Sequence, residues 1–372
     1  MKTSLALLTV LILAACSGGD DAPPQSTVTP PAPSPAPQPR PPPSALFVLG
    51  DSLSDVGNAA AASDYVLSVA IDPPTVGLCN PTDVLVAMRP CDDLFYRKSR
   101  VSNGPVAVER LAEQLGLPPL RPSLHLLPNR SRDGTVYAFA SAKARGRGDE
   151  DLARQVDWLL LDHTPLPSDP VYVVMIGGND AIDALQADVA NRGAAPLPSA
   201  AIIEATVESI GIHVERLLDF GARRVVVANV LDLATLPSVR KEAQATTDES
   251  GMLAMASAIS ESFNRSLATR LDRIDARASS LTPPPVIARF DLNAALSVAR
   301  QTMSASGANS VAACFDTELY WDSPTAQRMF HPDCAPAVSG GEPRFDRFVF
   351  FDGIHPTGAT HAALGNALRA LL

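Results

Sequence analysis

The chain has 372 residues, of which 46% are hydrophobic and 19% are charged, and its formal net charge is −10 at pH 7. An acidic chain without a basic tract lacks the electrostatic footprint of nucleic-acid binding, so we expect no nucleic-acid partner. The length suits one large α/β domain that follows non-globular N-terminal segments.

The first residues have the features of an export signal. Lys2 precedes the apolar run Leu5–Leu13, which is too short to span a bilayer, and small residues then lead to Cys16. This pattern resembles a bacterial lipobox, in which the cysteine is acylated and becomes the first residue of the mature protein. We therefore expect a signal peptide over residues 1–15 and a lipid anchor on Cys16. Because Ser17 rather than aspartate follows, the resemblance implies the outer membrane, on its periplasmic face or at the cell surface. An ordinary signal peptide that contains a cysteine is the alternative.

A proline-rich stretch follows this signal. Between Cys16 and Ser44 the sequence is rich in proline, above all over Thr29–Pro43. Such a segment cannot build a core, and we expect a semi-rigid polyproline II spacer that extends ~3 Å per residue. A docking ligand for peptide-binding domains is the other interpretation. The predicted organisation is therefore a linker over residues 16–44 and one globular domain over residues 45–372.

Apolar and helical patterns alternate through the predicted domain. Apolar, β-branched runs predict five strands, at Leu46–Leu49, Val136–Phe139, Val171–Ile176, Arg224–Val230 and Val286–Phe290. Amphipathic patterns predict helices at Val106–Leu115, Leu152–Leu161, Ala201–Phe220, Met252–Leu271 and Thr357–Leu371. This alternation predicts an α/β fold, a three-layer α/β/α sandwich around a five-stranded parallel sheet. The irregular segment Val56–Arg100 predicts a surface insertion.

The cysteines of the predicted domain fall into two local pairs, Cys79 with Cys91 and Cys314 with Cys334. Because export leads to an oxidising compartment, we predict two short-loop disulfides. A zinc site that includes His331 is the alternative, but no C-x-x-C spacing supports it.

Two motifs at opposite ends of the predicted domain carry reactive side chains. The strand Leu46–Leu49 runs into a Gly-Asp-Ser sequence, which places the hydroxyl of Ser52 where a parallel strand stops. Far along the chain, Asp352 stands three residues before His355, a spacing that lets the carboxylate hold the imidazole Nδ1–H within a turn. We predict that Ser52 is a nucleophile, His355 its general base and Asp352 the residue that orients the base. For Ser52 alone, a helix N-cap is the alternative.

A further polar motif, Gly177–Asp180, follows the predicted strand Val171–Ile176. This strand ends at the same sheet edge as the strand before Ser52. We therefore predict that the amide of Asn179 stabilises an acyl oxyanion, a contribution on the order of 3 kcal/mol. The alternative for Asn179 is a turn residue, and Asp180 is interpreted as a structural residue that braces the loop.

These residues lie in four blocks that together resemble the SGNH hydrolases of the GDSL type, specifically their bacterial lipase and phospholipase-like branch. The blocks are G-D-S-L-S-D-V-G-N at 50–58, S-N-G-P at 102–105, G-G-N-D at 177–180 and F-D-G-I-H-P-T at 351–357. The resemblance spans nearly the whole predicted domain. It implies a flavodoxin-like fold and an esterase or lipase that forms an acyl-enzyme on Ser52.

The resemblance also implies a main-chain oxyanion donor from a glycine after the second strand, beside the N–H of Ser52 and the amide of Asn179. Here the chain departs from the family, because Val136–Ala142 reads V-Y-A-F-A-S-A and contains no glycine. A main-chain donor does not depend on its side chain, so we expect the N–H of Ala140 to take this role. Gly104 is the alternative donor.

The other histidines are expected to have no catalytic or metal-binding role. His361 follows His355 by six residues on the same predicted helix, about 120° around it, and is interpreted as a surface residue. The remaining ones stand without a cluster of carboxylates in the sequence, at His125, His163, His213 and His331. We predict no metal and no cofactor.

The sequence therefore predicts a monomeric, lipid-anchored serine esterase or lipase. Its expected partners are an ester or lipid substrate and the membrane. An acyltransferase or a glycan O-deacetylase would use the same triad, and a catalytically silent surface-binding lipoprotein is the alternative from another class. The acyl chain and the alcohol of the substrate have no recognisable signature in the sequence.

Overall fold

The computed structural model describes residues 41–62, 100–128, 132–192, 194–316, 330–335 and 343–372. Its strands are β1 (Leu46–Gly50), β2 (Val171–Met175), β3 (Arg224–Ala228), β4 (Val286–Phe290), β5 (Asn309–Ala313) and β6 (Phe348–Phe350). Its helices are α2 (Ala107–Gln114), α3 (Leu152–Asp162), α4 (Gly178–Ala190), α5 (Pro198–Asp219), α6 (Pro237–Gln244), α7 (Glu249–Ala278), α8 (Leu292–Ala305) and α10 (Gly358–Leu371). The predicted signal peptide, most of the linker and most of the predicted insertion lie outside the described residues.

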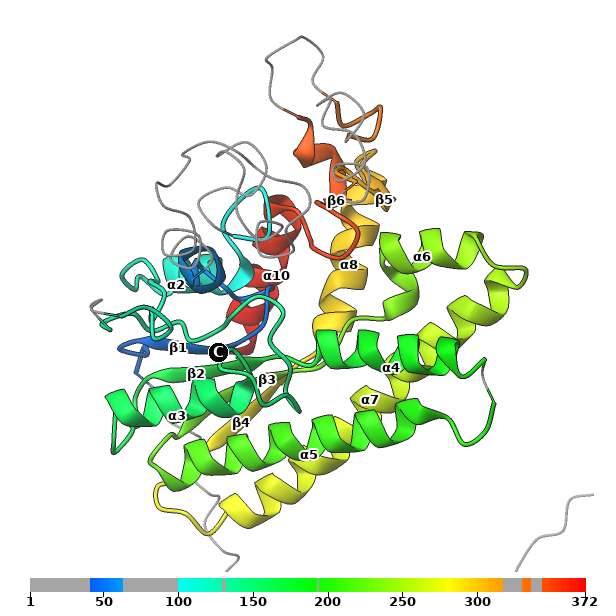
Figure 1. Ribbon diagram of the computed structural model, residues 1–372. Coiled ribbons are helices and arrows are strands. Elements are labelled where there is room, and N and C mark those ends of the chain that lie inside the picture. The colour runs from blue at the N-terminus through cyan, green and yellow to red at the C-terminus, as the bar shows by residue number, and fades with distance from the viewer. Residues whose placement is uncertain (1–40, 63–99, 129–131, 193, 317–329, 336–342) are drawn as a thin grey trace, which may run out of the picture. The chain divides into compact units, whose positions relative to one another are not determined.

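The main sheet has four parallel strands in the order β1-β2-β3-β4. All residues of β1 and β2 are buried, as expected for parallel strands that helices cover on both faces. In Figure 1, α2 and α10 lie on one side of this sheet, and α3, α5 and α7 lie on the other. The predicted three-layer α/β/α fold with a parallel sheet is confirmed.

The predicted strand Val136–Phe139 lies beside β1 and parallel to it, but it forms only an isolated bridge. The N–H of Tyr137 donates to the carbonyl of Val48 at 2.7 Å. The side-chain amide of Asn58 donates to two carbonyls of this segment, at 2.8 and 2.9 Å. The N–H of Gly50, which would continue the ladder from β1, donates to the side chain of Gln155 instead, so the segment is an irregular edge of the sheet rather than a regular fifth strand.

This edge segment sets where the sheet can form a crevice. When it is counted with the four strands, the spatial order is 2-1-3-4-5 in chain numbering. In such a doubly wound order the chain leaves β1 in one direction and later returns to the other side of it at β2. The loops after β1 and β2 therefore diverge, and a ligand-binding crevice opens at their carboxyl ends. The motifs with Ser52 and Asn179 both begin there.

A second, two-stranded parallel sheet pairs β5 with β6. The sequence patterns do not predict it, because β6 has three residues and β5 carries few large apolar side chains. A separate core cluster lies at this sheet and includes Phe315, Phe330, Phe345, Phe348 and Phe351. This cluster packs directly before the residues of the Asp352 motif.

The cysteine predictions have two outcomes. Cys314 and Cys334 form a disulfide within the aromatic cluster, as predicted. That bond removes both thiolates as zinc ligands, so the zinc alternative at these residues is wrong. The pairing of Cys79 with Cys91 falls outside the described residues, as does Cys16.

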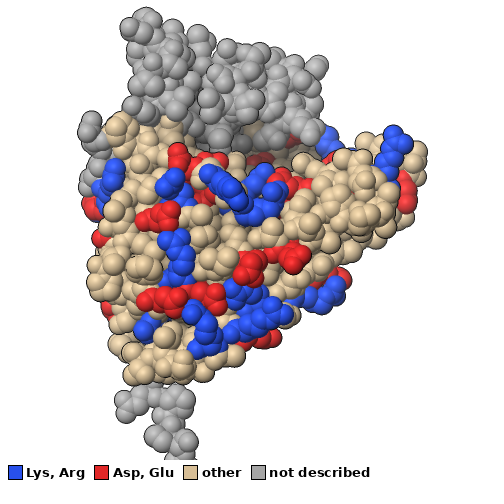
Figure 2. Space-filling view, turned by 60° about the horizontal axis from the view of Figure 1, so that its bottom comes forward, with Lys and Arg blue, Asp and Glu red and all other residues tan. Residues whose placement is uncertain are grey.

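The outer face of α5 and α7 carries charges of both signs. Arg270 of α7 binds Glu208 and Glu215 of α5 at 3.0 and 2.9 Å. Figure 2 shows basic and acidic side chains interspersed over the lower face of the molecule in Figure 1. The charge on this face is therefore neutralised locally by ion pairs. No helix in the described part of the chain combines the length and the apolar character needed to cross a membrane.

Candidate active site

The turn that carries Ser52 depends on the close approach of β1 and β2. A Cβ atom on Gly50 would lie 2.4 Å from the carbonyl oxygen of Met175, so only glycine fits there. The N–H of Asp51 donates to the same oxygen at 3.2 Å, and the N–H of Ser54 donates to the carbonyl of Asp51 at 3.0 Å. These contacts hold Ser52 at the carboxyl end of β1.

Two buried polar side chains support this turn, and sequence reasoning assigned a role to neither. Gln155 of α3 accepts from the N–H of Gly50 and donates to its carbonyl, both at 2.8 Å. Asp55 accepts from the N–H groups of Gly57 and Asn58 at 2.7 Å. Burial raises the pKa of Asp55, although these N–H groups oppose the shift. Gln155 could have been identified from the sequence, because it is a polar residue on the otherwise apolar face of α3.

The structure brings the three residues of the predicted triad together. Nε2 of His355 lies 2.8 Å from Oγ of Ser52, although 303 positions separate the two residues. Nδ1 of His355 lies 2.9 and 2.8 Å from the two carboxylate oxygens of Asp352. The N–H groups of Ile354 and His355 donate to Oδ1 of Asp352 at 2.8 and 2.7 Å, which fixes the carboxylate within its turn.

Burial and charge oppose each other in the Asp352–His355 pair. Burial by itself would raise the pKa of Asp352, but the charge and hydrogen bonds of His355 keep it below its ordinary value. Burial by itself would lower the pKa of His355, but the carboxylate of Asp352 raises it above its ordinary value. The pair therefore stabilises an imidazolium beside a carboxylate, the state that forms when the imidazole takes a proton.

The block at residues 102–105 supports the loop of the base. The hydroxyl of Ser102 donates to the carbonyl of Pro356 at 2.9 Å, and the side chain of Asn103 accepts from the N–H of Gly358 at 2.8 Å. A Cβ atom on Gly104 would lie 3.4 Å from Cα of Gly358. Gly104 thus packs against the start of α10, where a donor would face the base loop.

A mostly apolar cleft opens beside Ser52. Its polar lining includes Asp51, Ser52, Asn179 and Asn229. Its apolar lining includes Leu53, Ile182, Leu231, Leu233, Leu236, Leu292 and Ile354. These side chains come from the turn after β1, from α4, from the segment after β3, from the start of α8 and from the loop of the base. The cleft therefore lies at the crevice that the strand order predicts, and most of its wall is apolar.

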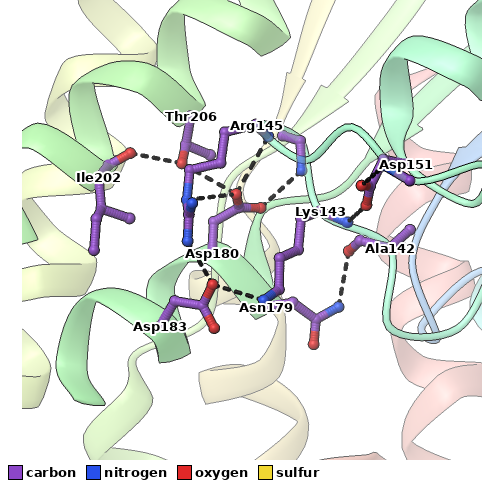
Figure 3. A network of polar contacts seen from close by, with 11 residues as sticks. Ala142, Lys143, Arg145, Asp151, Asn179, Asp180, Asp183, Ile202 and Thr206 are labelled. Atoms are coloured by element: carbon purple, nitrogen blue, oxygen red, sulfur yellow. Dashed lines mark hydrogen bonds and ion pairs between the residues drawn. The ribbon is translucent and has the colours of Figure 1, made fainter. Parts of the chain in front are cut away.

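Asn179 enters this cleft from the first turn of α4. The preceding Gly177 has a φ of 116°, and a Cβ atom there would lie 2.6 Å from the ring of Phe263, so glycine is required on both counts. The side-chain amide of Asn179 donates to the carbonyl of Ala142 at 2.9 Å (Figure 3). The structure therefore places this amide in the same cleft as Ser52, beside the loop that follows the edge segment.

The expectation for Ala140 is contradicted. Its N–H donates to Oδ2 of Asp55 at 2.9 Å, and the residue is 4% exposed. A buried N–H that already binds a carboxylate cannot also receive an oxyanion without breaking that bond. The next residue, Ser141, has a φ of 69° in a turn that the N–H of Ala142 closes on the carbonyl of Phe139 at 3.1 Å. Turns of this kind favour glycine at the position that Ser141 occupies. The lack of a family glycine in this block is therefore felt at Ser141.

Asp180 braces the loop after Ser141, as the sequence indicates. Its carboxylate accepts from the N–H groups of Ala144 and Arg145 at 2.8 and 3.3 Å (Figure 3). Burial raises the pKa of Asp180, and the two N–H groups and the Arg145 side chain oppose the shift. Asp183, one turn further along α4, binds the side chains of Lys143 and Arg145 at 2.7 and 2.5 Å. The loop is therefore tied to α4 at several points.

The interpretation of His361 as a surface residue is wrong. His361 is 1% exposed, because its face of α10 packs against α2, and its Nδ1 accepts from the N–H of Ala107 at 3.2 Å. Burial, with His355 and a nearby arginine, lowers the pKa of His361 to about 3. His125 lies 2.7 Å from one carboxylate, that of Asp162, and stacks on Trp158. A helical angle gives the direction of a side chain but not what packs there.

The described residues contain no group of three or more His, Cys, Asp or Glu side chains placed to hold a metal ion. The geometry combines a serine hydroxyl, an imidazole and a carboxylate in one hydrogen-bonded chain, with a side-chain amide in the same cleft. This combination can perform acyl transfer through the serine.

Comparison with known proteins agrees with this geometry. The family model of the GDSL-like lipases and acylhydrolases matches residues 46–368, which covers both motifs of the triad, the Asn179 motif and all strands of the main sheet. No curated protein matches the chain. The chain belongs to the GDSL-like lipase/acylhydrolase family, and it is a hydrolase of ester bonds.

Proposed function

We propose that the chain is a serine esterase that cleaves carboxylic esters through an acyl-enzyme on Ser52. The observation that carries this proposal is the chain of hydrogen bonds from Ser52 through His355 to Asp352, with 2.8 Å between Oγ and Nε2. In this proposal Oγ of Ser52 attacks the ester carbonyl while Nε2 of His355 takes its proton. The imidazolium then protonates the leaving alcohol. Water, deprotonated by the same imidazole, releases the acid from Ser52.

The oxyanion is proposed to bind the N–H of Ser52 and the amide of Asn179. Each such donor contributes on the order of 3 kcal/mol when it points at the developing charge. With the N–H of Ala140 engaged by Asp55, we assign the further main-chain donor to Ser141. Among the described residues no acceptor is found for the N–H of Ser141 or of Ser52. Support for Ser141 comes from its position in the turn beside the carbonyl that Asn179 binds.

The substrate class we infer is an ester of an aliphatic acyl chain, including lipids. Leucine and isoleucine side chains dominate the cleft, among them Leu53, Ile182 and Leu236. A sugar would leave its hydroxyls unpaired against such a wall, which disfavours glycan deacetylation. Transfer of the acyl group to an alcohol instead of water would use the same residues.

Attachment to a membrane remains a proposal from the sequence. Its support is the lipobox-like approach to Cys16 and the proline-rich stretch behind it, a combination that fits an exported bacterial lipoprotein. Cys16→Ser in the full-length chain should move the protein from the membrane fraction to the soluble fraction, or block its maturation. Unchanged partitioning into detergent would rule out the anchor.

The proposed function is tested with Ser52→Ala. The variant should lose hydrolysis of p-nitrophenyl esters and covalent labelling by a fluorophosphonate, while its thermal unfolding stays close to that of the wild type. A series of p-nitrophenyl esters, assayed beside a phospholipid and an acetylated sugar, defines the acyl class. We expect longer aliphatic esters to be hydrolysed with a higher kcat/KM than the acetylated sugar. Labelling that persists in a folded Ser52→Ala variant would place the nucleophile elsewhere.

A further inference from the structure

Asp51 is a buried carboxyl group at the centre of the crevice, and the triad chemistry does not use it. It is 3% exposed, yet it lines the same cleft as Ser52 and Asn179. One carboxylate oxygen accepts from the N–H of Leu53 at 3.1 Å, within the turn that carries Ser52. A buried carboxyl group is costly unless it is bonded, so its other contacts are informative.

The second contact of this carboxylate is the start of α4. The N-cap residue of α4 is Gly177, which has no side chain to bind the free N–H groups of the first turn. The N–H of Gly178 stabilises the ionised form of Asp51 instead, and a Cβ atom on Gly178 would lie 3.6 Å from Oδ2 of Asp51. Asp51 therefore supplies, from the turn after β1, the anionic cap that α4 lacks.

This cap links two groups that must act together. Ser52 follows Asp51 directly in the chain, and Asn179 follows Gly178 directly on the first turn of α4. The carboxylate thus bridges the turn of the nucleophile and the helix end that carries the oxyanion amide. It adds a buried side-chain link to the main-chain bond from Asp51 to Met175, which already joins the ends of β1 and β2.

The charged groups around Asp51 are few. His355, from the loop before α10, lowers the pKa of Asp51, and Asp180 of α4 raises it. Burial dominates and raises the pKa of Asp51 to about 6. In return, ionised Asp51 adds to Asp352 in raising the pKa of His355. The charges of two carboxylates therefore act on His355, and Asp352 is the one hydrogen-bonded to it.

We propose that Asp51 is a positioning residue for ester hydrolysis, which holds the first turn of α4 and its Asn179 amide against the Ser52 turn and adds negative charge beside His355. The inference rests on the proposed function of Ser52, His355 and Asn179. It assigns to Asp51 no contact with the reacting atoms. Its two effects are separable, since one acts on the oxyanion through Asn179 and the other on the protonation of the base.

The test compares Asp51→Asn with Asp188→Asn in the full chain. Asp188 is also a buried carboxyl on α4, and it accepts from the N–H of Ser199 at 2.9 Å, away from the cleft. For Asp51→Asn we expect kcat on a p-nitrophenyl ester to fall about tenfold or more, with KM within about twofold, because the loss is in the transition state. Asp188→Asn should keep kcat near that of the wild type.

The pH profile separates a positioning role from a merely structural one. His355 must be neutral to act as a base, so the acid limb of kcat/KM follows its pKa. Loss of the Asp51 charge removes an influence that raises this pKa, and the acid limb should move to lower pH, by about half a unit or more. Asp188→Asn should leave the limb in place.

A double-variant cycle tests the route through Asn179. If Asp51 acts on the oxyanion through this amide, Asp51→Asn should lower kcat much less in an Asn179→Ala background than in the wild type. Should Asp51→Asn fail to fold, Asp51→Ser keeps a short acceptor for the helix end without the charge, and the same measurements apply. A folded variant with wild-type kcat and an unshifted acid limb, or full additivity with Asn179→Ala, would overturn the inference. Ser52→Ala remains inactive in either case, which keeps this outcome distinct from a failure of the proposed function.

Discussion

The nucleophile and the base of the proposed triad are held by two different parts of the molecule. The turn of Ser52 ends β1, whose residues are all buried in the main core, and buried Gln155 binds the last residue of that strand. The loop of His355 follows the short β6, which pairs with β5 beside an aromatic cluster and a disulfide. One half of the site therefore depends on the central sheet and the other on a small satellite core.

This difference has consequences for stability and activity. A disturbance of β1 weakens the whole domain, because that strand is central to the main core. A disturbance of the β5–β6 sheet can displace the base while the main core stays folded. The N–H of Phe351 donates to the carbonyl of His355 at 2.7 Å, and the N–H of Phe315 donates to the carbonyl of Phe351 at 2.8 Å. The satellite core thus reaches the base through two consecutive main-chain bonds.

The largest expected effect comes from the carboxylate that links the satellite core to the base. Asp352→Asn should lower kcat by on the order of 10⁴-fold, because the imidazole loses the partner that sets its tautomer and stabilises its charge. Asp346→Asn changes an exposed carboxyl in the same segment and should leave kcat nearly unchanged. Steady-state kinetics with a p-nitrophenyl ester measures both. Comparable activity in the two variants would mean that Asp352 does not orient the base.

Removal of the disulfide tests whether the satellite core can fail alone. Cys314→Ser with Cys334→Ser should lower the free energy of unfolding of that region by about 3 kcal/mol, for a loop of 20 residues. We expect kcat to fall about tenfold while hydrogen exchange of β2 and β3 amides stays slow. Val173→Ala, in the main sheet, should instead cost about 2 kcal/mol of global stability with little change in kcat of the folded protein.

Reductant gives an independent control for the disulfide variant. Added to the wild type, it should reproduce the loss of kcat, and any further loss in the double serine variant would come from the predicted Cys79–Cys91 bond. Loss of protection in β2 and β3 together with β6 would show that the two cores unfold as one unit, which would contradict the comparison.

The third prediction concerns the junction of the two cores, where two histidines have opposite shifts. His361 has a pKa of about 3 when folded, below its ordinary value, so the unfolded chain binds the extra proton and stability falls as pH drops from about 6.5 towards 3. His355 has a raised pKa, so its contribution is present below about 6.5 and is lost as pH rises through the folded value.

His361→Asn isolates the first of these two effects. The asparagine oxygen can still accept from the N–H of Ala107, but it does not titrate. Between pH 7 and pH 5 the wild type should lose about 2 kcal/mol of unfolding free energy through His361, and the variant should not show this loss. Urea unfolding at both pH values measures this difference. A wild type and a variant with the same pH dependence would show that His361 does not titrate in this range.

The smallest expected effect lies on the nucleophile side, at the turn without glycine. Ser141→Gly should stabilise the protein by about 1 kcal/mol, because glycine adopts the φ of 69° without strain, and kcat should change by less than about threefold. Ala140→Gly is the matched variant and should bring no gain, since Ala140 has no positive φ to relieve. Thermal unfolding compares the stability of the two variants. A larger gain in stability from Ala140→Gly than from Ser141→Gly would contradict the assignment of the strain to Ser141.

Much of the fold could be predicted because its signals are local. Apolar runs bounded by glycine or proline located β1 to β4 within two residues of their ends, and β4 matched its prediction. The helices α4, α6 and α8 were not predicted, since their apolar faces are narrow or interrupted by polar residues. The edge segment at Val136 was predicted as a strand, but its ladder with β1 is interrupted where the N–H of Gly50 donates to the Gln155 side chain.

The sequence by itself determined the chemistry of the site, because a serine after one strand and an aspartate three residues before a histidine carry a recognisable chemistry wherever the fold brings them together. Only the tertiary structure decided which main-chain N–H groups remain free, since the bond from Ala140 to Asp55 joins residues 85 positions apart. It also decided that His361 is buried and that Asp51 bridges two loops. Such features depend on which surfaces pack together, and local periodicity contains no information about the partner of a given face.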